Sequence, residues 1–115
     1  MPQAHILVVA PEGELRHSLR FALEAELFDV TWQASLGARP VPGEYDCTII
    51  DHHAIGGDLT AARRFVAAFQ PVILLSNGPH ELSPFVFRTI LKPHLGAPLV
   101  EGVRDALDRA RASTT

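Results

Sequence analysis

The chain has 115 residues, 47% of them hydrophobic, and a formal net charge of −3 at pH 7. This length suits a single domain with its own core, so we expect one domain over residues 1–115, with 112–115 as a tail or the start of a linker. Acidic and basic residues are interspersed and leave no basic stripe for nucleic acid, and no apolar run approaches the ~20 residues that cross a bilayer. We therefore expect a cytoplasmic protein.

Short apolar runs predict a parallel β-sheet. Residues 6–9, 47–50 and 72–75 are nearly unbroken aliphatic runs, typical of strands buried on both faces. Residues 30–34 alternate between apolar and polar side chains, as an edge strand does, and residues 89–91 form a short fifth strand. The only cysteine, Cys47, begins one of the buried runs. Its thiol is expected to be buried, and an internal disulfide is excluded.

Three amphipathic helices are predicted between and after these strands. Their apolar faces are Leu15, Leu19, Ala22, Leu23 and Leu27; Leu59, Ala62, Val66 and Phe69; and Leu99, Val103, Ala106, Leu107 and Ala110. Arg16 falls on the polar side of the first helix. Prolines in residues 37–44 and 78–87 disfavour full helices there, because proline in a helix interior costs ~3 kcal/mol. The helices after the second and fourth strands are therefore expected to be shortened.

Polar residues follow three of the predicted strands: Asp51 after the third, Ser76 after the fourth and Lys92 after the fifth. In open α/β sheets, ligands bind outside the carboxyl ends of the strands, so these side chains are expected to converge. A carboxylate can accept a phosphoryl group, whose oxygens a lysine and a hydroxyl can bind. Taken singly, Asp51 and Ser76 could be turn residues and Lys92 a solvated strand end.

Four segments resemble the receiver domain of two-component response regulators, in the family's order and over nearly the whole chain. They are HILVV at residues 5–9, YDCTIID at 45–51, PVILLS at 71–76 and LKP at 91–93. The resemblance implies a flavodoxin-like α/β fold, a three-layer sandwich around a five-stranded parallel sheet of order 2-1-3-4-5.

The resemblance also implies roles for individual residues. Asp51 matches the phosphoacceptor, Ser76 the switch hydroxyl and Lys92 the lysine that contacts the phosphoryl group. The bond between Lys92 and Pro93 matches the family's cis peptide, consistent with the confinement of cis bonds to proline. The family's switch aromatic is replaced by Thr89.

The acidic site departs from the family's pattern. The family places two acidic residues directly after the first strand, where they hold Mg²⁺, but this chain has Ala10 and Pro11 there, and Glu12 comes one place late. Mg²⁺ prefers near-octahedral oxygen ligands, so Asp51 and the backbone carbonyl of His53 predict only a weak metal site. We expect Mg²⁺ to be weakly bound or absent, and no other cofactor.

Two further features are open to more than one interpretation. The adjacent His52 and His53 could suggest a transition-metal site, but adjacent side chains leaving a strand point apart, which favours an exposed loop with His94 and Glu12 as polar neighbours. Phe85 and Phe87 could fill the space left by a shortened helix, or form an exposed apolar patch for dimerisation or partner docking.

These observations predict a non-enzymatic, receiver-like signalling module of a two-component phosphorelay, acting by protein contact with impaired or absent Mg²⁺-dependent phosphorylation. The alternative is a conventional receiver phosphorylated on Asp51. A small flavodoxin-like enzyme or ligand-binding domain is disfavoured, because no glycine-rich loop follows the first strand. The expected partners are a sensor histidine kinase or another signalling protein, a C-terminal output domain outside this chain, and a second copy of the chain.

Overall fold

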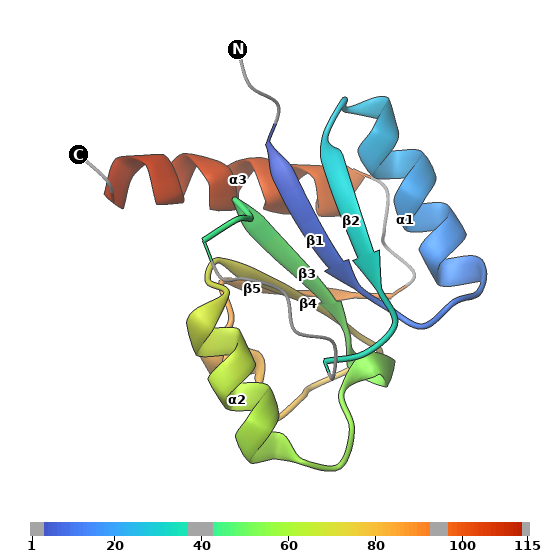
Figure 1. Ribbon diagram of the computed structural model, residues 1–115, viewed down its shortest axis with the longest axis vertical. Coiled ribbons are helices and arrows are strands. Elements are labelled where there is room, and N and C mark those ends of the chain that lie inside the picture. Colours follow the sequence, from blue (N-terminus) through green and yellow to red (C-terminus); the bar gives the residue numbers. More distant parts are fainter. Residues whose placement is uncertain (1–3, 37–42, 93–96, 114–115) are drawn as a thin grey trace.

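Five parallel strands form one sheet in the order β2-β1-β3-β4-β5, with helices on both faces (Figure 1). The computed structural model describes residues 4–36, 43–92 and 97–113. The strands are β1 (His5–Val9), β2 (Asp29–Gln33), β3 (Cys47–Asp51), β4 (Val72–Ser76) and β5 (Arg88–Leu91). The helices are α1 (Glu14–Ala25), α2 (Leu59–Ala68) and α3 (Ala97–Ser113), with short 3₁₀ turns η1 (His52–Ala54) and η2 (Ser83–Phe85). This architecture confirms the predicted flavodoxin-like sheet.

The two faces of the sheet bury separate apolar clusters. Alternate residues of a strand point to opposite faces, so Ile6 and Val8 of β1 pack with α1 and α3, whereas Leu7 and Val9 pack with α2. Helices α1 and α3 therefore cover one face and α2 covers the other (Figure 1). Strand β2 lies at the edge with its side chains only partly buried or exposed, as its alternating sequence predicts.

Helix α1 ends in a Schellman motif that removes one predicted core residue. The backbone N–H of Leu27 donates to the carbonyl of Glu24 at 3.0 Å, and that of Phe28 donates to the carbonyl of Leu23 at 3.4 Å. Leu27 adopts the left-handed conformation, with φ of 63°, and is 70% exposed. The prediction of Leu27 on the core face is wrong, because the helix ends at Ala25 and its period no longer applies.

The proline-containing connections lack a full helix in their described parts, as predicted. Between β2 and β3, residues 34–36 and 43–46 contain no helix. Between β4 and β5, a single 3₁₀ turn, η2, takes the place of a helix. Leu82, just before that turn, is 1% exposed and packs into the α2 cluster, so this short connection still contributes to the core.

Three further expectations concern Cys47, membrane-spanning helices and Ala110. Cys47 is buried as predicted, and its burial, with a smaller contribution from the negative charge of Asp46, raises the pKa of its thiol to about 12. In the described part of the chain, no helix has the length and apolar character needed to span a membrane. The side chain of Ala110, expected on the core face of α3, lies outside the described residues.

Candidate functional site

Asp51 and Lys92 form an ion pair at the carboxyl edge of the sheet. Asp51 is the last residue of β3 and is 2% exposed, and Lys92 directly follows β5. The Lys92 Nζ lies 2.5 Å from Oδ1 of Asp51 and 3.3 Å from Nδ1 of His53. The buried carboxylate is therefore neutralised by a partner, as a charge in a protein interior requires.

The sheet register brings Ser76 to the same edge. Asp51 pairs with Leu75 of β4, and Ser76 pairs with Leu91 of β5. The backbone N–H of Lys92 then donates to the carbonyl of Ser76 at 2.9 Å. Parallel strands point their carboxyl ends the same way, so the three predicted residues meet at one edge.

The Ser76 hydroxyl takes part in a turn. It donates to the carbonyl of Gly78 at 2.8 Å and accepts from the backbone N–H of Gly78 at 3.3 Å. This is the turn role that the sequence left open for Ser76. Both hydrogen bonds are local, so a hydroxyl that binds a phosphoryl oxygen would first have to leave this turn.

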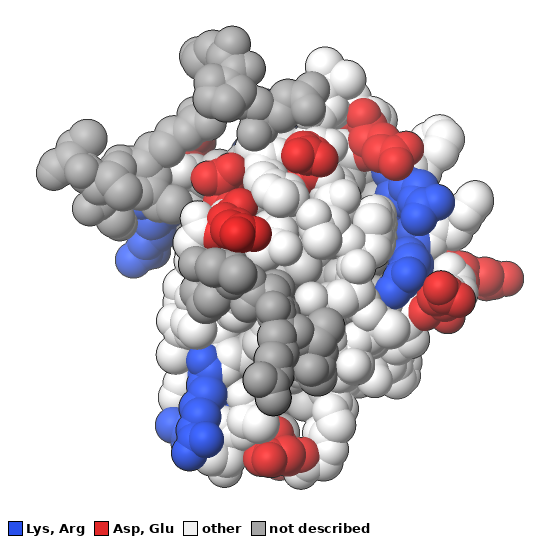
Figure 2. All heavy atoms as spheres, in the orientation of Figure 1, with Lys and Arg blue, Asp and Glu red and all other residues white. Residues whose placement is uncertain are grey.

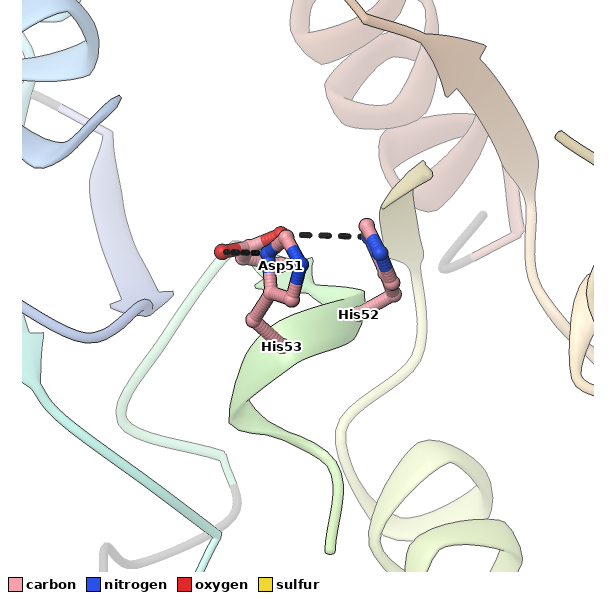
Figure 3. A group of neighbouring side chains, drawn as sticks. All are labelled: Asp51, His52 and His53. Carbon is pink, nitrogen blue, oxygen red and sulfur yellow. Dashed lines mark ion pairs between the residues drawn. The ribbon is translucent and has the colours of Figure 1, made fainter. Parts of the chain in front are cut away.

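His52 and His53 fold back towards Asp51 (Figure 3). Their ring centroids are 4.0 Å apart, and their Nδ1 atoms lie 3.4 Å from Oδ1 and 3.5 Å from Oδ2 of Asp51, respectively. The prediction that these side chains point apart is wrong, because the turn η1 begins directly after Asp51 and its tighter geometry replaces the alternation of a strand. His94, one expected neighbour, lies outside the described residues.

The two imidazoles differ in their surroundings. The His52 side chain is 20% exposed and its Nδ1 donates to the carbonyl of Leu75 at 3.1 Å, whereas the His53 side chain is 60% exposed. Burial lowers the pKa of His52, and the positive charge of Lys92 and the neighbouring His53 ring add to the effect against the opposing Leu75 carbonyl and Asp51 carboxylate. His52 is therefore neutral at pH 7.

Arg16 is a second cation at the sheet edge, which the sequence pattern did not reveal. Its Nη2 donates to the carbonyl of Ala10 at 2.6 Å, its guanidinium lies over the ring of Trp32, and its side chain is 15% exposed. Although Arg16 lies on the polar side of α1, its side chain does not extend into solvent, because it folds back onto the end of β1. Glu12 pairs with Arg16 Nη1 at 3.8 Å and is 86% exposed, so it is not the predicted neighbour of the histidines.

The described donors at this edge do not fit Mg²⁺. Ala10 and Pro11 offer no side-chain oxygen, and the Ala10 carbonyl already accepts from Arg16. Asp51 is the one carboxylate in the described cluster, and it is paired with Lys92 and faced by two imidazoles. Mg²⁺ prefers an octahedral set of oxygen ligands, which this arrangement does not supply.

Phe85 and Phe87 lie away from this edge, before β5. Phe85 is 44% exposed, with the Arg63 guanidinium 4.3 Å from its ring centroid. Phe87 is half-buried against the cluster under α3, and the guanidinium groups of Arg88 and Arg109 lie 5.4 Å and 5.9 Å from its ring centroid. Phe87 thus contributes to the core, whereas Phe85 presents an aromatic surface.

Comparison with proteins of known structure shows which folds this chain resembles. No protein-family model and no curated protein matches the sequence. A CheY-like receiver domain protein from Methanospirillum hungatei JF-1 has a TM-score of 0.79 and 21% identity, over 97% of this chain and 99% of that chain. The receiver domain of a sensor histidine kinase from Pseudomonas aeruginosa PAO1, with a magnesium ion in its active-site cleft, has a TM-score of 0.75 and 18% identity, over 93% of this chain and 99% of that one.

A longer protein contains the same fold as one part. Full-length FixJ from B. japonicum has a TM-score of 0.76 and 22% identity, over 99% of this chain and 62% of FixJ. This chain therefore spans about three-fifths of that protein. Together these similarities show that the chain has the fold of response-regulator receiver domains.

Proposed function

We propose that this chain is a receiver-like signalling module of a two-component phosphorelay that acts by protein contact rather than as an enzyme. The observation that carries the proposal is the buried Asp51–Lys92 pair at the carboxyl edge of a receiver fold. In this proposal Asp51 stands at the phosphoacceptor position, with Lys92 and Ser76 at the positions that contact the phosphoryl group. Such a module works in the cytoplasm, and the whole of residues 1–115 acts as one domain.

The proposal includes impaired Mg²⁺-dependent phosphorylation of Asp51. Phosphorylation requires a carboxylate oxygen of Asp51 to attack phosphorus while the bond to the leaving group breaks, which brings several negative oxygens together. A bound metal supplies several kcal/mol to such a step, and its loss slows the step about a thousandfold. With Ala10 and Pro11 in place of the acidic pair, the Asp51–Lys92 pair stabilises the unmodified state instead.

Intact-mass analysis after incubation with acetyl phosphate and Mg²⁺ tests this part. We expect no added phosphoryl mass on the wild-type chain. A stoichiometric mass gain that disappears in Asp51→Asn would favour the alternative, a conventional receiver that transfers the phosphoryl group to Asp51 and releases acetate. In the same way, thermal stabilisation by beryllofluoride with Mg²⁺ would support the conventional receiver, and stabilisation by flavin or a nucleotide would support a ligand-binding domain.

The proposed partner surface is centred on Phe85. Phe85 lines two neighbouring grooves, one with Phe87 and Arg109 and one with Arg63 and Arg64 of α2. An exposed aromatic ring among arginines suits a protein contact, because such rings and Arg are enriched in interfaces. We propose this surface for contact with a sensor histidine kinase, another signalling protein, an output domain or a second copy of the chain.

Substitution of Phe85 tests this surface. Phe85→Ala is expected to weaken a measured dimer or kinase interaction by tenfold or more, as the loss of an interface anchor of about 2 kcal/mol would. Phe21→Ala is the matched control, because Phe21 is 80% exposed on α1, on the other face of the sheet. If Phe85→Ala leaves the affinity unchanged, Phe85 is not a contact residue.

The charge distribution supports a protein partner over nucleic acid. On the face shown in Figure 2, basic side chains lie in separate groups over α1, over α2 and beside the C-terminal part of α3, with acidic side chains beside and between them. A nucleic-acid backbone favours a continuous basic stripe, and binding through scattered charges would be weak at physiological salt. We therefore propose no direct nucleic-acid binding.

A further inference from the structure

We propose that Asp51, His52 and His53 form a binding site for Zn²⁺ and similar divalent cations that prefer imidazole ligands, in place of the family's Mg²⁺. The site lies where η1 turns the two histidines back towards the end of β3 (Figure 3). The proposal does not depend on whether Asp51 accepts a phosphoryl group, because it concerns only the ligand atoms of the unmodified side chains.

The spacing of the donor atoms supports a single ion. Within the described part of the chain, one ligand atom from each of the three residues lies within 4.8 Å of the other two. For His53, whose Nδ1 is free to bind a metal, the separation from Oδ2 of Asp51 is 3.5 Å. Ligands at about 2.0–2.1 Å from a tetrahedral zinc ion are themselves about 3.3–3.4 Å apart. Small side-chain movements would therefore complete the coordination.

The donor types select the metal. Imidazole nitrogens suit Zn²⁺, Cu²⁺ and Ni²⁺, whereas Mg²⁺ prefers oxygen ligands. The Nδ1–H of His52 donates to the carbonyl of Leu75 at 3.1 Å, which fixes the tautomer with a lone pair on Nε2. Metal-binding histidines commonly have such an outer hydrogen bond to a backbone carbonyl. The 60% exposure of the His53 side chain leaves a path from solvent.

Lys92 holds the position that the ion would take. Its Nζ contacts both Oδ1 of Asp51 and Nδ1 of His53, at 2.5 Å and 3.3 Å. An ammonium group can only donate, so the lone pair of His53 Nδ1 and the Asp51 carboxylate are directed at one shared cation position. A divalent ion binds there by displacing the ammonium, and Lys92 therefore limits the affinity.

Calorimetric titration of the full chain with zinc chloride at neutral pH tests the site. We expect one high-affinity equivalent that a large excess of Mg²⁺ does not displace, and a Co²⁺ complex whose visible absorption indicates imidazole coordination. His53→Ala should weaken Zn²⁺ binding about tenfold or more, as loss of a ligand or its support typically does. His17→Ala is the control, because His17 is exposed on α1, and it should leave the affinity unchanged.

Lys92→Met separates this site from a simple pair of surface histidines. Removal of the competing ammonium should raise the Zn²⁺ affinity about tenfold, because the positive charge of Lys92 repels a nearby divalent cation and occupies the same donors. The proposal would be overturned by any of four results: no zinc binding, displacement of zinc by Mg²⁺, an unchanged zinc affinity in His53→Ala, or a lower zinc affinity in a folded Lys92→Met. If Lys92→Met does not fold, the zinc affinities of His53→Ala and His17→Ala still test the proposed site.

Discussion

Lys92 reaches Asp51 from a strand two places away in the sheet, and their side chains meet at 2.5 Å. The Asp51 and Lys92 side chains are only 3% and 14% exposed, so solvent screens this pair little. Removal of one partner would leave the other charge without compensation in a poorly solvated place. The pair is therefore expected to contribute strongly to the stability of the sheet edge.

A double-mutant cycle measures this contribution. Lys92→Met is expected to lower the free energy of unfolding by about 3 kcal/mol, because it leaves a buried carboxylate unpaired. Asp51→Asn should cost less, since the freed lysine can extend into solvent. The double variant should recover much of the loss, with a coupling energy above about 1 kcal/mol from urea denaturation. Strictly additive effects would contradict a functioning ion pair.

Leu27→Gly is expected to stabilise the protein. Leu27 adopts a φ of 63° at the C-terminal end of α1 and is 70% exposed. A left-handed residue with a side chain is strained by about 1–2 kcal/mol, which glycine avoids. The greater backbone freedom of glycine in the unfolded chain offsets part of this relief. The expected net gain in the free energy of unfolding is about 0.5–1 kcal/mol. A calorimetric melt would show a higher Tm, and Leu27→Ala, which keeps the strain, should not show it.

Two buried or half-buried threonines should respond oppositely to valine. Thr48 of β3 is 1% exposed, and its Oγ1 has no hydrogen-bond partner within the described residues. Thr48→Val exchanges that hydroxyl for a methyl group of similar shape and should raise the free energy of unfolding by about 1 kcal/mol. Thr31 Oγ1 lies within hydrogen-bonding distance of Nε2 of His5, at 2.8 Å. Thr31→Val removes this hydrogen bond and should lower the free energy of unfolding by a similar amount. Equal changes in the two chemical denaturation midpoints would contradict this account.

Cys47 should resist alkylation in the folded protein. Its thiol is 1% exposed and has a pKa of about 12, so at pH 8 only about one thiol in ten thousand is ionised. We expect no mass gain with iodoacetamide at pH 8 in buffer and complete reaction in guanidinium chloride. Rapid labelling of the native chain would show that β3 opens readily.

The same thiol predicts a loss of stability at alkaline pH. The thiol of an unfolded cysteine has a pKa of about 8.5, whereas folding raises the pKa of Cys47 to about 12. The folded state therefore holds this proton more tightly, which adds to the free energy of unfolding. This contribution is fully present below about pH 8.5 and declines as the pH rises towards about 12. Cys47→Ala should remove this part of the pH dependence of urea unfolding, although its baseline stability is lower. Identical pH slopes for the two proteins would contradict the raised pKa.

Much of the fold could be predicted from local patterns. The aliphatic runs in β1, β3 and β4 indicated buried parallel strands, and the alternating residues of β2 indicated an edge strand. The prolines of residues 78–87 indicated that no full helix precedes β5, where the structure has only the turn η2. These predictions succeeded because strand alternation and proline geometry act within a few residues. The helical period failed at Leu27, because a period alone does not indicate where a helix ends.

The candidate site was predictable only in part. The placement of Asp51, Ser76 and Lys92 followed from parallel strands that end at one edge. The cis bond expected between Lys92 and Pro93 lies outside the described residues and stays a prediction. The return of His52 onto Asp51 was not predictable, because it depends on a 3₁₀ turn after β3.

By itself, the sequence determined the sheet, its covered faces and the residue types that follow each strand, because burial and backbone preferences repeat along the chain. Only the tertiary structure decided which of those side chains touch. Arg16 turns onto the carbonyl of Ala10, and Lys92 lies between Asp51 and His53, because groups distant in sequence compete for the same few partners. That competition is settled by three-dimensional distance, which a linear pattern does not contain.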